Sequence, residues 1–383
     1  MIDLIASLAL PALDAPPDDA SAQVAHGYAT QVRRRIQAML ERTGTDPLVL
    51  DAMMPACLRP GWRPEVGMAA HLCTTRPQLA ALQFIAAVAS HAVPADVTLE
   101  LGAPGRIYVD GHRLEVAGTT TVRVETSTLE LESQRGHWSL RHDGTRFSVL
   151  SSPVGGERCV LRWRPGSGLR YLVDVGSGHT EGVFPDPLAC AGTVPGLSRN
   201  DFRVAVQGIT EAMEIIHEAS ASYAAWIDTV IDGVLVTRDA LDCGLSSPGH
   251  PGLLAVRSGR EPLDYVEMIV AAAAQQKLLQ IAMITPLGEQ GREQLHYLPH
   301  RRWYTTSRRA LASAHEHHNV SRVLACIAAR SGADGALRRR IARRQLMLAL
   351  DGRQPLQRDH ALSAAGARLR QMLDAGSPSS LAV

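Results

Sequence analysis

The sequence predicts an α+β fold, because the spacing of apolar residues changes twice along the chain. Apolar residues recur at helical spacing in residues 1–95, alternate with polar residues in 96–180, and return to helical spacing in 181–376. We therefore expect a helical N-terminal unit, an antiparallel β meander in the middle and a mainly helical C-terminal region. Residues 377–383 are expected to form a loose tail.

Two helices are expected in the N-terminal unit. Residues 21–44 carry apolar side chains on one side, and Gly44 ends the segment. Residues 76–92 follow the same period and have Pro77 in the first turn, where a helix leaves its N–H groups unbonded. In the C-terminal region, helices are expected near residues 201–227, 262–284, 305–330, 335–350 and 356–374.

The middle unit consists of short runs with a period of two between residues 97 and 175. Turn pairs such as Asp110-Gly111 and Asp143-Gly144 separate these runs. An Asp-Gly pair between two alternating runs is typical of a tight hairpin turn. The pattern therefore predicts one meander in which consecutive strands pair.

The charge balance and the hydropathy of the chain argue against two classes of partner. Lysine and arginine number 39 against 38 acidic residues, so the molecule as a whole has no field that attracts nucleic acid or membrane surfaces. No apolar run without charge approaches the roughly 18 residues that a membrane-spanning helix needs. We expect no nucleic-acid partner and no membrane association.

The cysteines and the start of the chain indicate the cellular compartment. The six cysteines are widely scattered without C-x-x-C spacing, which indicates neither a zinc ribbon nor a disulfide framework. The apolar first ten residues include Asp3 and have no Lys or Arg before them, which argues against a secretory signal. These features predict a cytoplasmic protein with reduced thiols.

A cluster of arginines in the helix expected at 335–350 has two interpretations. Its members are Arg338, Arg339, Arg340, Arg343 and Arg344. They form either a solvated helix face or a surface for an anionic partner. A nucleic-acid surface normally interleaves such charges with stacking aromatics, and no aromatic residue follows Tyr304 in the sequence.

The helix expected at 262–284 has the outline of a metalloenzyme's core helix without the metal ligands. A His-Glu-x-x-His motif places two imidazoles one turn apart on one helix face, with a carboxylate beside them. This chain has Ala271, Ala272 and Gln275 at those positions. Alanine has no donor atom, and an amide oxygen is a poor substitute for imidazole on a transition metal. The sequence therefore predicts no high-affinity metal site on this helix.

The surroundings of this helix carry a resemblance to a known family. Upstream lies Ser246-Ser247-Pro248-Gly249, and downstream lie Tyr297-Leu298-Pro299-His300-Arg301-Arg302 and then His315. In this order the features resemble a family of bacterial HExxH-motif proteins that occur with ribosomally made peptides. Its members are regarded as peptide-modifying enzymes, some of them 2-oxoglutarate-dependent peptide β-hydroxylases. The resemblance covers roughly residues 195–330.

The resemblance implies a retained pocket in which an arginine would bind a carboxylate such as 2-oxoglutarate. Its candidate residues are His315, His318, Asn319, Tyr297, Arg301 and Arg302. One surviving ligand does not hold a metal, so we expect a vestigial pocket. Two alternatives are open: a metal site rebuilt from His315 and His318 with another residue, or a polar helix start in contact with solvent.

Three functions follow as hypotheses. The first is a degenerate member of the family, acting in ribosomal peptide biosynthesis, that binds a precursor peptide or a protein partner without a metal or other cofactor. The second is an active peptide β-hydroxylase that uses Fe(II) and 2-oxoglutarate with a non-standard ligand set. The third is a structural subunit that pairs with a catalytic homologue. A short precursor peptide encoded beside the gene would support the peptide hypotheses.

Overall fold

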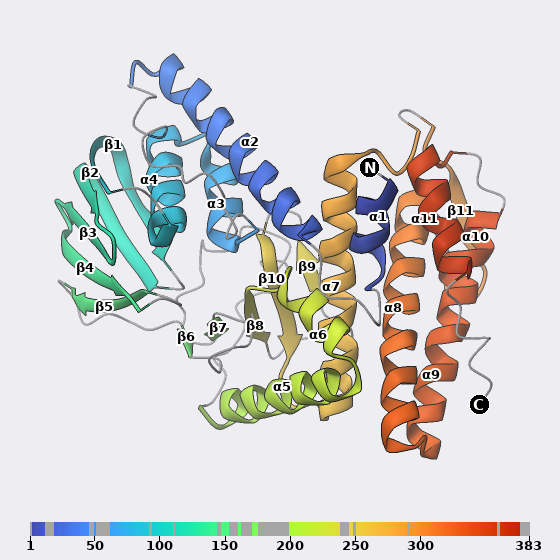
Figure 1. Ribbon diagram of the computed structural model, residues 1–383. Helices are drawn as coiled ribbons and strands as arrows, with labels where there is room; N and C mark the ends of the chain where they lie inside the picture. Colours follow the sequence, from blue (N-terminus) through green and yellow to red (C-terminus); the bar gives the residue numbers. More distant parts are fainter. Residues whose placement is uncertain are drawn as a thin grey trace.

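The computed structural model has the predicted α+β fold, with helices at both ends of the chain and an antiparallel sheet between them (Figure 1). It describes residues 2–11, 19–45, 50, 62–91, 94–109, 112–143, 147–152, 160–161, 171–174, 199–237, 245–247, 250–289, 292–357 and 361–375. The tail expected at 377–383 lies outside the described residues.

The first sheet is an antiparallel meander, as predicted for this part of the chain. Its strands pair in sequence order. They are β1 (Ala95–Val109), β2 (His112–Val124), β3 (Thr128–Ser133), β4 (Gly136–His142) and β5 (Phe147–Ser151). Val97, Leu99 and Leu101 of β1 are buried while the residues between them are exposed, so one face of the strand is in the core.

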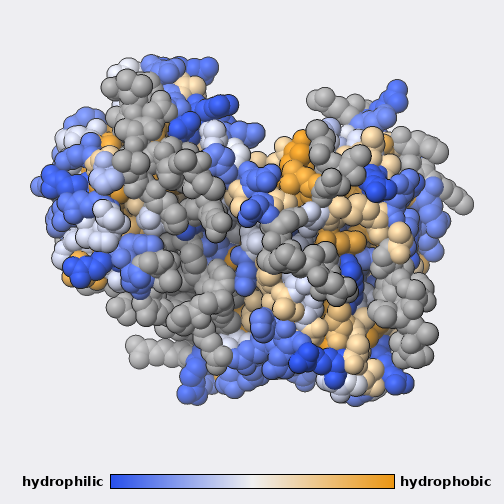
Figure 2. All heavy atoms as spheres, in the orientation of Figure 1, coloured by the Kyte–Doolittle hydropathy of each residue, from blue (hydrophilic) through white to orange (hydrophobic). Residues whose placement is uncertain are grey.

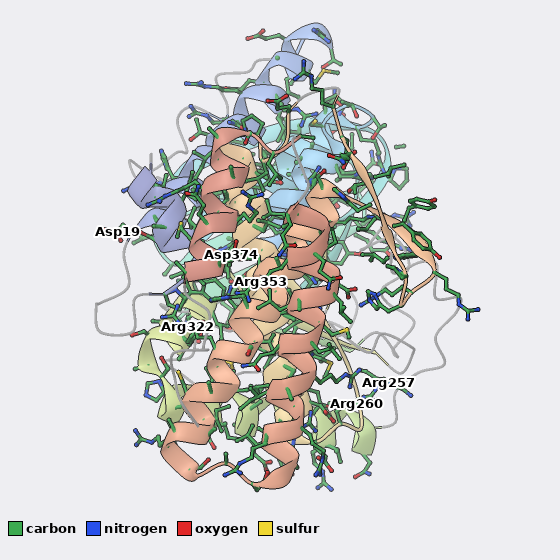
Figure 3. All side chains as sticks on the ribbon, turned by 90° about the vertical axis from the view of Figure 1, so that its right-hand side faces the viewer. Asp19, Arg257, Arg260, Arg322, Arg353 and Asp374 are labelled. Carbon is green, nitrogen blue, oxygen red and sulfur yellow. The ribbon has the colours of Figure 1, made fainter. Side chains whose placement is uncertain are left out.

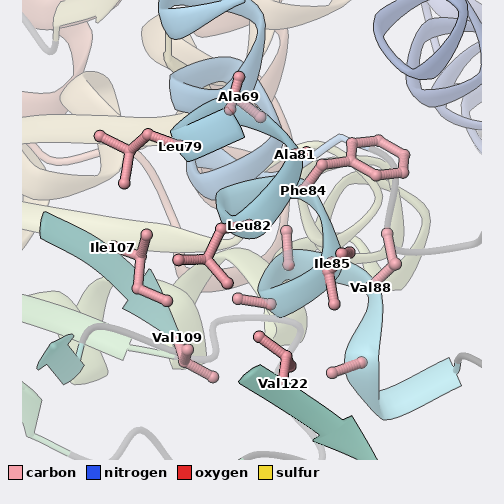
Figure 4. Close-up of a cluster of buried hydrophobic side chains, with 14 of the residues drawn as sticks. Ala69, Leu79, Ala81, Leu82, Phe84, Ile85, Val88, Ile107, Val109 and Val122 are labelled. Carbon is pink, nitrogen blue, oxygen red and sulfur yellow. The ribbon is translucent and has the colours of Figure 1, made fainter. Parts of the chain in front are cut away.

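Three helices of the N-terminal region lie beside this sheet. They are α2 (Ala20–Arg42), α3 (Pro64–Leu72) and α4 (Pro77–Val88), and the 3-10 turn η3 (Ala89–His91) follows α4. Leu82 and Ile85 of α4 are fully buried against Ile107 and Val122 of the sheet (Figure 4). The apolar face of the meander is therefore covered by α4, and the helix and the sheet share one core.

The prediction of a single meander is wrong beyond β5. A second sheet has the order β6-β7-β8-β10-β9, in which β7 runs parallel to β8. Its strands are β6 (Val160–Leu161), β7 (Tyr171–Asp174), β8 (Gly233–Thr237), β9 (Leu245–Ser247) and β10 (His250–Arg257). Strands from both sides of the boundary expected at residue 180 thus share one sheet. Apolar residues at every second position indicate that one face of a strand is buried, but they do not identify the strand with which it pairs.

The C-terminal region is mainly helical, as predicted. Its helices are α5 (Arg199–Ala219), α6 (Ala221–Asp228), α7 (Pro262–Ile284), α8 (Ser307–Ser331), α9 (Gly335–Met347), the π-helix η6 (Leu348–Arg353), α10 (Gln354–Gln357) and α11 (Ala364–Ala375). The one helix expected to reach residue 227 is broken at Ser220, whose side chain accepts a hydrogen bond from the Tyr223 N–H (3.3 Å) and caps α6.

Helix α7 is the central helix of the molecule. Glu261 and Asp264 form a capping box at its start, with Pro262 in the first turn. Ala271 to Ala274 are fully buried between neighbouring helices, which small side chains allow to approach closely. The buried Gln276 side chain accepts hydrogen bonds from Trp62 Nε1 (2.8 Å) and the Gly252 N–H (3.3 Å), which ties α7 to the second sheet.

The N-terminal helix α1 (Ile2–Ala9) packs with the C-terminal helices rather than with α3 and α4. It contacts α7 and α11, far from the meander (Figure 1). Ile5 and Leu8 of α1 are buried in one apolar cluster with Leu278 and Leu311. The helical unit expected at residues 1–95 therefore does not pack as one body, because the apolar side of α1 completes a core formed by distant residues.

A short hairpin completes the C-terminal region. Strands β11 (Leu295–Leu298) and β12 (Trp303–Thr306) form a two-stranded antiparallel sheet immediately before α8. Within the segment from Tyr297 to Arg302, Tyr297 and Leu298 end β11, and residues 299–302 form the turn. Apolar residues reach the surface mainly over the helical part of the molecule, while the meander side is largely hydrophilic (Figure 2). Within the described ranges no helix combines the length and hydropathy needed to cross a membrane.

Candidate functional site

The positions that match the missing metal motif lie in the core. Ala271 and Ala272 are fully buried in the apolar cluster around α7. Gln275 is half-buried, and its Nε2 donates to Glu316 Oε2 across the interface with α8 (3.1 Å). The residue of α8 that is hydrogen-bonded to Gln275 is therefore the acidic Glu316. The side chain of the neighbouring His315 leaves the helix in another direction and is bonded to Ala9.

His315 is hydrogen-bonded to the end of α1. Its Nε2 lies 2.7 Å from the Ala9 carbonyl oxygen, and Asn319 Nδ2 donates to the same oxygen (3.3 Å). Trp226 Nε1 donates to the neighbouring Leu8 carbonyl (3.1 Å). A helix end has carbonyls without partners in the helix, and here three buried side chains supply the donors. We call Trp226, His315 and Asn319 the α1 cap.

The prediction that the start of α8 could be a polar segment in contact with solvent is wrong. His315, His318 and Asn319 are fully buried, and His317 is 7 % exposed. α8 packs against α7, α9 and α11, so even its polar residues lie between helices. The sequence pattern His-Glu-His-His looked exposed because such residues are usually solvated, and the packing of α8 on several sides overrides that preference.

The surroundings of His315 and His318 are positively charged. Burial, with a smaller contribution from the charge of nearby Lys277, lowers the pKa of His315 to about 4. Burial lowers the pKa of His318 to about 3, with a further contribution from Arg322. Arg322 and Arg353 flank this region, and Arg353 pairs with Asp374 (3.1 Å; Figure 3).

The residues present do not fit an iron centre. His315 directs Nε2 at a backbone carbonyl, and its ring lies beside the Ala274 carbonyl and the charge of Lys277. A metal cation bound through His315 and His318 would lie among Lys277, Arg322 and Arg353, which opposes its binding. In the described part of the chain, no three His, Cys, Asp or Glu side chains are grouped to hold a metal ion.

The other side of α8 carries a network of ion pairs, which we call the ion-pair cluster. Its members are Asp264, Glu267, Gln275, Glu316, His317, Arg340 and Arg344. Arg340 Nη1 donates to Asp264 (2.6 Å) and Glu267 (2.7 Å), and Arg344 Nε donates to Glu267 (2.5 Å). Arg340 and Arg344 therefore face inward, so only part of the arginine cluster predicted in this helix is a solvated face.

Two buried groups in the ion-pair cluster have shifted pKa values. Burial raises the pKa of Glu316, although the hydrogen bond from Gln275 and the charge of Arg344 lower it. Burial, together with the charge of the adjacent Arg344, lowers the pKa of His317 to about 3. The ring nitrogen Nδ1 of His317 lies 3.1 Å from Arg344 Nη1, so this nitrogen is the acceptor and carries no proton.

Arg301 lies in the turn of the β11–β12 hairpin and is paired with Asp351. Its Nε donates to Asp351 Oδ1 (3.2 Å), its Nη2 contacts Asp351 Oδ2, and His300 Nε2 lies 2.5 Å from Oδ1. Asp351 belongs to the π-helix η6, and the neighbouring Gly352 lies so close to α8 that a Cβ would meet Ala314 Cα at 2.7 Å. Arg301 also lies near enough to Glu316 to lower its pKa.

Tyr297 and Arg302 are exposed on the hairpin, whereas His315 and His318 are fully buried. Tyr297 is 52 % exposed, and its ring centroid is 5.1 Å from that of Tyr304 on the paired strand. Arg302 is exposed in the turn, with φ 54°. The structure thus separates the predicted pocket residues. His315 and Asn319 belong to the α1 cap, His318 is buried near Arg322 and Arg353, Arg301 is paired with Asp351, and Tyr297 and Arg302 are exposed on the hairpin.

Sequence reasoning missed several residues of these sites. Glu316, Asp351 and Trp226 have no motif around them, and each is placed by a partner far away in the chain. One signal was available for the hairpin. The runs Leu295–Leu298 and Trp303–Thr306 flank a short turn and are rich in aromatic and β-branched residues, which favour strands. A comparison with models of known protein families and with curated proteins finds no match.

Proposed function

We propose that this protein binds a peptide or protein partner without metal chemistry, as a degenerate relative of the HExxH peptide-modifying proteins. The environment of the motif positions supports the absence of a reactive centre: Ala271 and Ala272 fill the core, and Gln275 is bonded to Glu316. The α1 cap uses His315 for a backbone carbonyl. None of these groups has the freedom to hold or activate a substrate.

The observation that carries the binding proposal is the exposure of apolar side chains on the hairpin. Leu295, Tyr297, Trp303 and Tyr304 are 64, 52, 53 and 63 % exposed. Four large exposed side chains on eight strand residues are a concentration that usually marks an interaction site. Tyrosine and tryptophan are also the residues most enriched at binding hot spots. We call these four residues the hairpin patch.

The test is a binding titration with the peptide most closely linked to the protein. The DNA beside the gene is searched for a short open reading frame, and a peptide that it encodes is synthesised and titrated into the purified chain by calorimetry, once with EDTA and once with Fe(II) and 2-oxoglutarate. We expect the same dissociation constant in both buffers, because binding needs no ion. A titration that shows binding only with Fe(II) would contradict the proposal and support the oxygenase hypothesis.

A further inference from the structure

The β11–β12 hairpin has strand edges that no other described strand covers. In the described part of the chain, β11 and β12 pair only with each other. The Ser307 N–H donates to the Gln294 carbonyl at the open end of the ladder (3.1 Å). Hydrogen-bonded and non-hydrogen-bonded pairs alternate along an antiparallel ladder. The pairs Leu295–Thr306 and Tyr297–Tyr304 are therefore non-hydrogen-bonded, and their backbone N–H and C=O groups point outward.

The outer edge of β12 combines these outward groups with exposed rings. Tyr304 is 63 % exposed, and Trp303 beside it is 53 % exposed. Thr306 is half-buried and is the N-cap of α8, so its carbonyl accepts the first hydrogen bond of that helix and only its N–H is offered at this edge. An exposed edge with unpaired N–H and C=O groups is a template for another strand. Large side chains next to such an edge add apolar contacts that a bare backbone edge does not offer.

The charge around this edge is positive. From Gln294 to His315 the chain carries four arginines and no Asp or Glu. Arg301 is paired with Asp351, whereas Arg302, Arg308 and Arg309 are exposed at the two ends of β12. An extended peptide that lies along β12 would thus meet cationic side chains of the protein at both of its ends. Charge complementarity favours acidic residues at the matching positions of the partner.

We infer that the edge of β12 binds an extended peptide by strand addition, and that this peptide alternates apolar residues with acidic ones. This inference rests on the proposed function and names the partner of the hairpin patch. Backbone hydrogen bonds to the N–H and C=O of Tyr304 and to the N–H of Thr306 would fix the peptide. Tyr304 would contact its apolar residues, and Arg302 and Arg308 would pair with its carboxylates.

A peptide is favoured over a nucleic acid by two observations. Outward N–H and C=O groups on one edge match the spacing of another β-strand, not that of a sugar-phosphate chain. The molecule as a whole has a formal net charge of only +1, which gives no general attraction for a polyanion. A short oligonucleotide is therefore a competitor in the test rather than the expected ligand.

The test uses fluorescence anisotropy with the full chain and four labelled ten-residue peptides. The first alternates Val with Glu, and the second has Lys in place of each Glu. The other two are the first peptide with N-methyl groups on every second backbone nitrogen, one with the methyl groups on the Val nitrogens and one with them on the Glu nitrogens. We expect the Lys peptide to bind at least tenfold more weakly than the Glu peptide. The peptide whose methyl groups replace the N–H groups that face β12 should lose binding. The peptide methylated on the other nitrogens should keep it, since those N–H groups point away from the edge.

Variants of the chain locate the site. Arg302→Gln should weaken the Glu peptide several-fold, while the control Arg338→Gln, at an exposed arginine of α9, should leave binding unchanged. Tyr304→Pro removes an outward N–H and should abolish binding. If Tyr304→Pro loses the circular dichroism of the native fold, Tyr304→Ser replaces it, and a several-fold loss of affinity is expected.

The possible outcomes separate the inference from the proposed function. If neither pattern of N-methylation and none of the hairpin variants changes the affinity for the peptide, strand addition is overturned, but peptide binding by the protein still stands. No binding of these peptides or of the peptide encoded beside the gene overturns both. Tighter binding of a twelve-nucleotide single strand, or a dimer in light scattering that Tyr304→Ser dissociates, assigns the edge to another occupant and overturns the inference.

Discussion

Three side chains from two helices meet on the last two carbonyls of α1. Trp226, His315 and Asn319 are all buried, and each donates to Leu8 or Ala9. Tyr223 donates to Asn319 Oδ1 (3.1 Å) and so fixes the amide that faces Ala9. At the scale of single residues, the α1 cap is a structural device that uses His315, which was predicted to line a vestigial pocket.

The first prediction concerns His315. His315→Ala leaves a buried carbonyl with one donor fewer, and an unsatisfied buried polar group costs about 1–3 kcal/mol. We expect that loss in the free energy of unfolding measured by urea titration. His315→Gln retains an N–H donor of similar reach and should recover part of the loss. Equal stabilities of His315→Ala and the unmodified chain would contradict the role of His315 in the α1 cap.

The second prediction concerns pH and His318. His318 is fully buried, and its ring lies beside the Leu373 carbonyl, which accepts a hydrogen bond from Arg353 (3.1 Å). Its pKa is lowered from 6.5 to about 3 by burial, so the unfolded chain takes up a proton first as the pH falls. The free energy of unfolding therefore has its full value, as far as His318 is concerned, above about pH 6.5, and it decreases as the pH falls from 6.5 towards 3.

The measurement compares His318→Leu with the unmodified chain by urea unfolding at pH 7.5 and pH 5. Leucine is similar in size and does not titrate, so the variant should gain stability relative to the unmodified chain at the lower pH. The exposed His137 gives the control His137→Gln, whose effect should not change between the two pH values. A difference for His318→Leu that is the same at both pH values would refute the explanation.

At the scale of elements, α7 was predicted with its bounds intact. The helix was expected at 262–284 and spans Pro262–Ile284, because Pro262 and the apolar period mark it locally. The hairpin β11–β12 and the helix α1 were not predicted. Short segments have weak local signals, and both are stabilised by contacts with residues far away in the chain.

The third prediction concerns the motif positions of α7. Ala271 is fully buried between helices, so Ala271→His forces a larger polar side chain into a packed core, which costs about 1–3 kcal/mol or more. Gln275 is half-buried, and Gln275→His can still donate to Glu316, so its cost should be much smaller. Thermal unfolding of the two variants measures the difference. Similar melting temperatures would mean that position 271 has more space than the packing indicates.

At the scale of the whole molecule, the fold class was predictable and the arrangement of the candidate site was not. Hydropathy periods identify helices and strands because each buries one face locally. The site depends on how α8 is rotated against α7: this rotation places Glu316 beside Gln275 and directs His315 to Ala9. It is set by packing on several sides of α8, and no short stretch of sequence encodes it.

The mass of a bound peptide tests the central claim most directly. The chain is incubated with the peptide encoded beside its gene, Fe(II), 2-oxoglutarate and air, and both the complex and the released peptide are measured by mass spectrometry. Since His315 serves the α1 cap and Ala271 and Ala272 have no ligand atoms, we predict a complex whose peptide keeps its original mass. A peptide that gains the mass of one oxygen atom, only when Fe(II) and 2-oxoglutarate are both present, would contradict the account.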